Sequence, residues 1–134
     1  MKALLDTNIL IATGSPGEPA PNLDGFDDLL VSTLSWSEMT RGVHAAKSIT
    51  VYRERHRILQ ALQAMFGPGL PCDDTCLPAY DTVMGRVADR DGDVRAHLTD
   101  RLLAATAITH ELTLVTRNVD DFTMFDDLLD VVER

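Results

Sequence analysis

Short apolar runs alternate along this chain with longer stretches in which apolar residues recur every three or four positions. Near the end of the chain, Leu98, Leu102, Ala105 and Ile108 share one helical face. The pattern predicts strands at residues 2–5, 29–31, 76–77, 112–116 and 129–132, and helices, caps included, at residues 7–12, 35–46, 48–66, 78–90 and 97–110. Because strands and helices alternate, we expect one α/β domain over residues 1–134, with a central parallel sheet and right-handed crossovers.

Polar residues mark where several of these elements begin and end. Ser35 followed three residues later by Glu38 is a capping-box sequence, which predicts the start of the second helix. Ser48 or Thr50 caps the third helix, and the Gly and Pro residues at 67–69 end it. The segment 14–25 is rich in Gly and Pro and is expected to be a loop, and the segment 117–121 a turn.

The charge of the chain limits how it can meet nucleic acid. The net charge is −9, from 12 basic and 21 acidic residues among 134. With this balance, contact with phosphate requires a local basic patch or a bound cation. The densest basic stretch contains Arg53, Arg55 and Arg57, which either contact nucleic-acid phosphates or form a solvated helix face.

Neither the apolar runs nor the cysteines indicate a membrane span or a structural metal. No apolar run approaches the roughly 20 residues that cross a bilayer, and the first residues lack the apolar core of a secretory signal. The expected location is therefore the cytoplasm. Cys72 and Cys76 have no His pair at zinc-ligand spacing, and their own spacing leaves open whether they form a disulfide.

Acidic residues recur at the places where strands end or helices begin. Asp6 follows the first strand, and Asn118 and Asp121 follow a later one. Glu38 and Asp100 lie in the first turns of predicted helices. In an open parallel sheet these places line one crevice, where ligands collect. Each residue also has a purely structural role available, as an N-cap or as the partner of a helix dipole.

Several carboxylates in one crevice would require compensation. Two anions about 4 Å apart repel by roughly 4 kcal/mol at an effective dielectric near 20, so such a cluster needs a bound cation or a raised pKa. Oxygen ligands alone favour Mg²⁺ or Mn²⁺. A metal held by Asp6 and Asp100 would lower the pKa of a bound water and stabilise the negative charge that develops during a hydrolysis.

Four segments of the chain together resemble a known family. They are LLDTNIL at the N-terminus, SWSEMTRG from residue 35, TDRLLAATAITH from residue 99 and LVTRNVDDF from residue 114. In this order they resemble the PIN domain and, at this length, the VapC toxins of bacterial type II toxin–antitoxin pairs. The resemblance implies a three-layer α/β/α fold, a Mg²⁺- or Mn²⁺-dependent endoribonuclease, a cognate VapB-type antitoxin and a homodimer.

The resemblance also implies which acids form the catalytic and metal-binding site. Asp6, Glu38 and Asp100 match the family's metal-binding acids. The fourth position is open between two residues. Asn118 stands where some members have an acid, which would weaken a second metal site, and Asp121 matches the acid before the family's Phe.

Two hydroxyls support this set of acids. Thr7 and Thr116 match hydroxyls that are expected to orient Asp6 in the family. Glu38 either orients the attacking nucleophile or completes the metal shell, and the sequence leaves both roles open.

Other classes that place an acid after the first strand fit less well. A phosphoaspartyl transferase would have a second acid two residues after Asp6, where Asn8 stands. A receiver domain would have an acid pair at the first strand and a Lys near the last one. A catalytically inactive PIN-fold module that binds RNA or protein is the remaining alternative, and RNA cleavage that EDTA abolishes would distinguish the enzyme from it.

Overall fold

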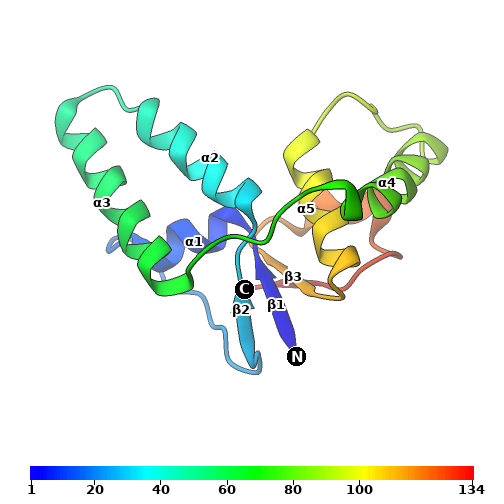
Figure 1. Ribbon diagram of the computed structural model, residues 1–134, viewed down its shortest axis with the longest axis horizontal. Helices are drawn as coiled ribbons and strands as arrows, with labels where there is room; N and C mark the ends of the chain where they lie inside the picture. The colour runs from blue at the N-terminus through cyan, green and yellow to red at the C-terminus, as the bar shows by residue number, and fades with distance from the viewer.

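The structure, a computed structural model, describes residues 1–134 and contains a four-stranded sheet between two groups of helices (Figure 1). In chain order its elements are β1 Lys2–Leu5, α1 Thr7–Gly14, β2 Asp28–Leu30, α2 Thr33–His44, α3 Ile49–Phe66, the 3₁₀ helix η1 Asp74–Cys76, α4 Leu77–Asp89, α5 Leu98–Thr109, β3 Thr113–Thr116, the 3₁₀ helix η2 Val119–Phe125 and β4 Val131–Glu133. None of the helices combines the length and apolar character that crossing a membrane requires.

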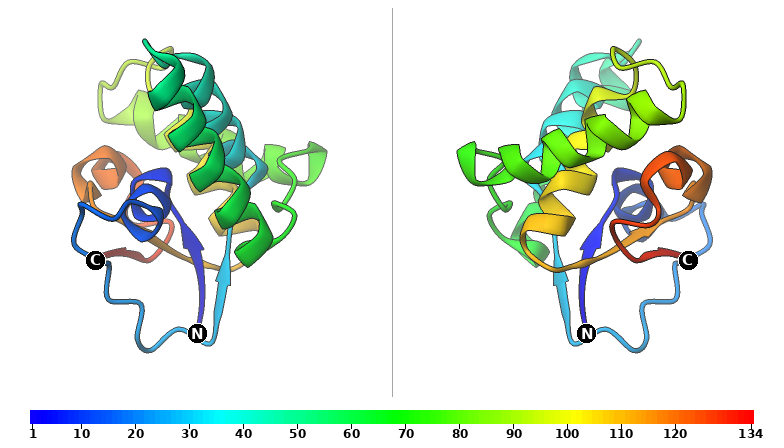
Figure 2. Two further views of the ribbon diagram at one scale, coloured as in Figure 1. Left: turned by 90° about the vertical axis from the view of Figure 1, so that its left-hand side faces the viewer. Right: turned by 90° about the vertical axis from the view of Figure 1, so that its right-hand side faces the viewer.

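The sheet is parallel throughout, as the alternation of strands and helices predicts. Its strand order is β2-β1-β3-β4, and every neighbouring pair is parallel. In Figure 2 the arrows of β1 and β2 run side by side in the same direction. The carboxyl ends of all four strands therefore lie along one edge of the sheet, the edge at which ligands collect in open α/β folds.

Alternate residues of the central strands face opposite layers of helices. Ala3 and Leu5 pack into one core with α1, α2 and α3, whereas Leu4 and Leu114 pack into a second core with α4 and α5. Side chains alternate across a strand with a period of two, so a continuous apolar strand is buried on both faces. Figure 1 shows the two helix groups on opposite sides of the sheet. The expected three-layer α/β/α architecture is confirmed.

The start of α2 differs from the prediction. Ser32, not Ser35, is the N-cap: its hydroxyl accepts a hydrogen bond from the backbone N–H of Leu34 at 3.1 Å. The helix begins as soon as the chain leaves β2, so Ser35 is already inside it and only 1% exposed. The predicted capping box is therefore wrong, and Glu38 lies in the second turn of the helix, where its side chain is free for other contacts. The cap of α3 is Ser48, one of the two predicted candidates.

The predicted strand at residues 76–77 is also wrong. Asp73 accepts hydrogen bonds from the N–H and hydroxyl of Thr75 and starts η1. The chain then continues directly into α4, whose first turn contains a proline, the residue that suits a helix start. Both cysteines are free thiols.

The predicted turn at 117–121 is shorter than expected. It continues into η2, which buries Phe122 and Phe125 in the core that packs with α4 and α5. The 3₁₀ helix therefore fixes where the acids that follow β3 lie.

Candidate metal centre

Four carboxylates from four separate elements meet at the carboxyl edge of the sheet. Asp6 follows β1, Glu38 lies in α2, Asp100 in the first turn of α5, and Asp121 in η2 after β3. The charges of Asp6, Asp121 and Glu38 all raise the pKa of Asp100. The structure thus brings together the four acids that the sequence singles out.

Asp6 is the most buried acid of the cluster, with 7% of its surface exposed. One carboxylate oxygen accepts the backbone N–H of Thr7 at 2.7 Å, and the other accepts the hydroxyl of Thr116 at 2.8 Å. Burial raises the pKa of Asp6, and the charges of Glu38 and Asp121 raise it further, against the opposing effect of the two hydrogen bonds. The side chain is held rigidly by donors on β3 and at the start of α1.

The hydroxyl of Thr7 does not orient Asp6 as expected. It donates instead to Oε2 of Glu38 at 2.7 Å. Asp6 is the N-cap of α1, so it takes the backbone N–H of Thr7, and the Thr7 side chain is left to contact α2. Thr7 therefore connects the two acids, with its backbone bound to Asp6 and its hydroxyl bound to Glu38.

Thr116, whose hydroxyl the family resemblance connects with Asp6, is the centre of a small hydrogen-bond network whose other members the sequence did not reveal. Besides donating to Asp6, its hydroxyl accepts the side-chain amide of Asn8 at 3.2 Å and the backbone N–H of Asn118 at 3.0 Å. Asn8 also accepts the backbone N–H of Arg117 at 3.1 Å. Asn8 thus ties α1 to the end of β3, and the only sequence signal for it was an amide two residues after the first acid.

Asp121 and Asn118 have different positions in the site. The Asn118 amide donates to Oδ2 of Asp121 at 2.7 Å. Asp121 lies close enough to Asp100 for both carboxylates to bind one metal ion. The geometry therefore favours Asp121 as the fourth acid, with Asn118 as the residue that orients it.

Of the four acids, Asp100 is the one whose negative charge is least stabilised by the protein. Its side chain is 24% exposed, yet it accepts no hydrogen bond from the protein. Burial, followed by the charges of Asp6, Asp121 and Glu38, raises the pKa of Asp100 to about 6, and only His97 acts in the opposite direction. This carboxylate is half-buried among like charges with no donor directed at it.

His97 belongs to the same cluster and was missed in the sequence. Its Nδ1 lies 3.8 Å from Oδ2 of Asp100, and single ligand atoms of His97, Asp100 and Asp121 all lie within 4.8 Å of one another. The signal that could have found it is its spacing, three residues before Asp100 at the start of a helix, since residues at i and i+3 are neighbours there.

The donor set suits a divalent cation. No Lys or Arg forms an ion pair with any of the four carboxylates, and the one basic partner is His97. Carboxylate oxygens are the ligands that Mg²⁺ and Mn²⁺ prefer. Asp100 and Asp121, beside Asp6, lie close enough together to hold such an ion. A cation there would offset the like charges that, after burial, raise the pKa values of Asp6 and Asp100.

A cavity of about 380 Å³ adjoins the acids on the side of α1, α2 and α3. Thr7 and Glu38 lie at its acidic end. The rest of its lining is largely apolar, with Ile11, Met39, Val43, Ile58 and Arg55 among the contributing residues. The carboxylate cluster therefore lies at one end of a largely apolar cavity, and Glu38 belongs to both.

The three arginines of α3 do not form one patch. Arg57 pairs with Glu54 at 2.7 Å. Arg55 donates to the backbone carbonyl of Gly42 at 2.7 Å and lines the cavity. Arg53 is exposed and has no acidic partner. Of these three arginines, Arg53 and Arg55 therefore carry positive charge that no acid neutralises.

Comparison with known proteins matches residues 3–128 to the PIN domain. No curated protein sequence matches the chain. Among solved structures, FitAcB from Neisseria gonorrhoeae is 27% identical with a TM-score of 0.77, covering 96% of this chain and 95% of that one. VapBC-5 from Mycobacterium tuberculosis, a member of the VapBC family of toxin–antitoxin systems, is 24% identical with a TM-score of 0.76, covering 98% and 96%. VapBC2 from Rickettsia felis, bound to a DNA fragment from its promoter, is 19% identical with a TM-score of 0.79, covering 100% and 99%.

Proposed function

Because the chain belongs to the PIN domain family, we propose that it is a metal-dependent endoribonuclease that acts in the cytoplasm as the toxin of a type II toxin–antitoxin pair. The observation that carries the proposal is Asp100, a half-buried carboxylate with a pKa raised to about 6, no hydrogen-bond donor and three other acids around it. A site that only stabilised the fold would supply donors to this group, since an uncompensated buried charge is costly.

In this proposal the acids have different roles in the hydrolysis of an RNA phosphodiester. Asp6, Asp100 and Asp121 hold Mg²⁺ or Mn²⁺, which when bound supplies Lewis-acid stabilisation of the negative charge that builds on the phosphate. Thr116 and Asn118 fix the orientation of Asp6 and Asp121 through their hydrogen bonds.

Glu38 acts beside these three ligands. The Thr7 hydroxyl occupies Oε2 of Glu38, which leaves Oε1 to accept a hydrogen bond from the attacking water and orient it toward phosphorus. The carboxylate thereby positions the water and accepts its proton as the new O–P bond forms. The P–O bond opposite the attacking oxygen breaks, and the leaving oxygen takes a proton from solvent.

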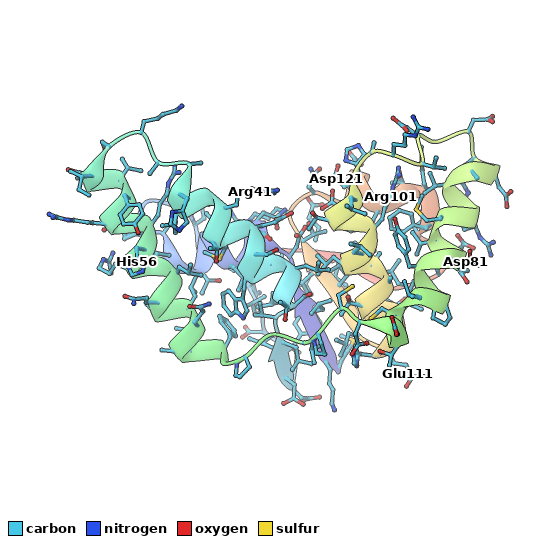
Figure 3. The ribbon with its side chains drawn as sticks, turned by 45° about the horizontal axis from the view of Figure 1, so that its top comes forward. Arg41, His56, Asp81, Arg101, Glu111 and Asp121 are labelled. Atoms are coloured by element: carbon cyan, nitrogen blue, oxygen red, sulfur yellow. The ribbon has the colours of Figure 1, made fainter.

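The RNA approaches along α2 and α3. The net charge of −9 repels phosphate, but four cations without an acidic partner gather on these helices and the turn between them: Arg41, Lys47, Arg53 and Arg55. Figure 3 shows Arg41 on α2, on the side that faces α5. This local excess of positive charge gives RNA a path to the acidic centre.

The antitoxin uses the cavity beside the acids. An apolar segment of the partner fills the space lined by Ile11, Val43 and Ile58, and a Lys or Arg from it reaches Glu38 and the neighbouring carboxylates. Such a cation would satisfy the acids in place of the metal and so block cleavage. The solved structures that resemble this chain include VapBC and FitAB complexes, which supports a VapB-type partner, and a toxin homodimer is part of the same proposal.

Cleavage of RNA by the purified chain tests the proposal. Wild type should cleave RNA with Mg²⁺ or Mn²⁺ and lose this activity in EDTA. Asp100→Asn should be inactive, because the amide is nearly isosteric but lacks the charge that holds the cation. Asp120→Asn is the matched control, since Asp120 is the exposed neighbour of Asp121, and it should remain active.

Two results would contradict the enzyme. Cleavage by Asp100→Asn at the wild-type rate would show that the acids are not its catalytic centre. RNA binding without EDTA-sensitive cleavage in wild type would assign the chain to the non-catalytic PIN-fold modules.

A further inference from the structure

The candidate metal centre contains one nitrogen donor among its oxygen donors. We propose that His97 is a ligand of the cation held by Asp100 and Asp121, and that its imidazole makes the site favour Mn²⁺ over Mg²⁺. This inference rests on the proposed function, because it concerns the same metal, and it adds a residue that determines which metal the site selects.

The positions of three side chains support this assignment. The ligand atoms of His97, Asp100 and Asp121 lie within 4.8 Å of one another, close to the separation of about 4.4 Å between opposite ligands of an ion with bonds near 2.2 Å. Nδ1 of His97 is 3.8 Å from Oδ2 of Asp100, which is too long for a hydrogen bond. Neither atom is committed to the other, so both are available to an ion between them.

The backbone holds His97 in this place. His97 is the N-cap of α5 and has left-handed backbone angles, φ 53° and ψ 41°. A non-glycine residue is uncommon in this region, although His, Asn and Asp enter it more readily than others. The conformation places the imidazole of His97 beside the donor-free oxygens of Asp100.

The loop before His97 is tied down by a buried arginine. Arg101, only 4% exposed, donates from its guanidinium to the backbone carbonyl of Asp93, and no acid pairs with it. The same carbonyl accepts the N–H of Ala96, and the carboxylate of Asp93 accepts the N–H of Arg95. Figure 3 shows Arg101 and Asp121 near α5. These hydrogen bonds hold the loop before His97 in place, and the loop positions His97 at the site.

A nitrogen ligand changes which cation the site selects. Mg²⁺ favours oxygen ligands and keeps several waters. Transition-metal ions accept imidazole, and their affinities for mixed nitrogen and oxygen sites rise from Mn²⁺ onward along the series. Removing the imidazole should therefore weaken Mn²⁺ more than Mg²⁺. If His97 formed only an ion pair with Asp100, its removal would free Asp100 for the metal. The affinities for Mn²⁺ and Mg²⁺ should then rise alike.

The experiment measures metal binding directly, without RNA. Mn²⁺ and Mg²⁺ are titrated by calorimetry into metal-free wild type, His97→Asn and His56→Asn, and the Mn²⁺ complexes are examined by pulsed EPR for nitrogen coupling. Asn tolerates the left-handed backbone of His97, so the fold is kept. His56→Asn is the control, because His56 is exposed on α3, well away from Asp121 (Figure 3).

We expect wild type to bind Mn²⁺ more tightly than Mg²⁺ and to show nitrogen coupling. His97→Asn should lose the coupling and at least about tenfold in Mn²⁺ affinity, with at most a few-fold change for Mg²⁺, and His56→Asn should match wild type. Unchanged Mn²⁺ affinity and coupling in His97→Asn would overturn the assignment of His97 and leave the carboxylate site intact. Absence of metal binding in wild type would overturn both this inference and the proposed metal-dependent function.

Discussion

Replacing Asp100 by Asn should stabilise the metal-free protein at neutral pH, although it removes the charge on which activity depends. Burial, followed by the charges of the neighbouring acids, raises the pKa of Asp100 from 3.8 to about 6. At pH 7 this shift corresponds to about 3 kcal/mol of folding free energy spent on keeping the carboxylate ionised. Partial exposure of the side chain, at 24%, makes this an upper value. The neutral amide avoids the cost, so the variant should gain up to that amount.

The gain should depend on pH in a defined direction. Because the folded-state pKa is raised, the folded protein binds more protons than the unfolded chain between pH 3.8 and about 6, so wild-type stability falls as the pH rises through this range. The advantage of Asp100→Asn should be about 1.6 kcal/mol at pH 5 and about 3 kcal/mol at pH 7. The raised pKa of Asp6 acts in the same direction in wild type.

Urea unfolding in EDTA, followed through the fluorescence of Trp36, the single tryptophan, provides the measurement. Adding Mg²⁺ at 100 times its dissociation constant should then stabilise wild type by about 2.7 kcal/mol, and the variant much less, so the stability advantage of the variant should nearly disappear. Asp120→Asn controls for a general loss of negative charge. Parallel pH profiles for wild type and Asp100→Asn would refute the reasoning, because they would show that Asp100 titrates normally.

Three further changes test other parts of the site. Thr116→Val should lower Mg²⁺ affinity at least about tenfold in calorimetry and cost about 1–3 kcal/mol in urea unfolding, whereas unaltered affinity would mean that the hydroxyl does not orient the site. Replacing Arg53 and Arg55 together by Ala should reduce the salt slope of RNA binding, measured by fluorescence anisotropy, by up to about two. Arg57→Ala should reduce it less because its charge is already paired, and equal effects would argue against a surface centred on the unpaired cations. Ile11→Lys should abolish co-purification of the antitoxin while RNA cleavage persists, since Ile11 is 41% exposed in the cavity lining, and retention of the partner would place its binding site elsewhere.

The sequence by itself determined the order and type of most elements. Strand β1 and helix α5 follow directly from apolar runs and from a 3.6-residue stripe, which are properties of short segments. The parallel sheet follows from the alternation of the elements. The meeting of the acids was also predictable, because the carboxyl ends of parallel strands share one edge whatever the details of packing.

Local signals failed where two of them competed for the same position. Ser32 and Ser35 are both good caps, and the sequence favoured Ser35 because Glu38 completes a capping box with it. The end of β2 decided the matter, since the helix must begin where the chain leaves the sheet. Glu38 was thereby displaced into the second turn and became free to accept the Thr7 hydroxyl.

Only the tertiary structure decided how the acids are held. The bond from Thr116 to Asp6 joins residues 110 apart in sequence, and that from Asn8 to Thr116 joins residues 108 apart, through the register of β1 against β3. His97 reaches Asp100 and Asp121 because its backbone is left-handed and η2 continues past the turn. Hydrophobic periodicity fixes which face of an element is buried, but a side-chain hydrogen bond depends on ångström-scale placement of two distant segments, which no local pattern encodes.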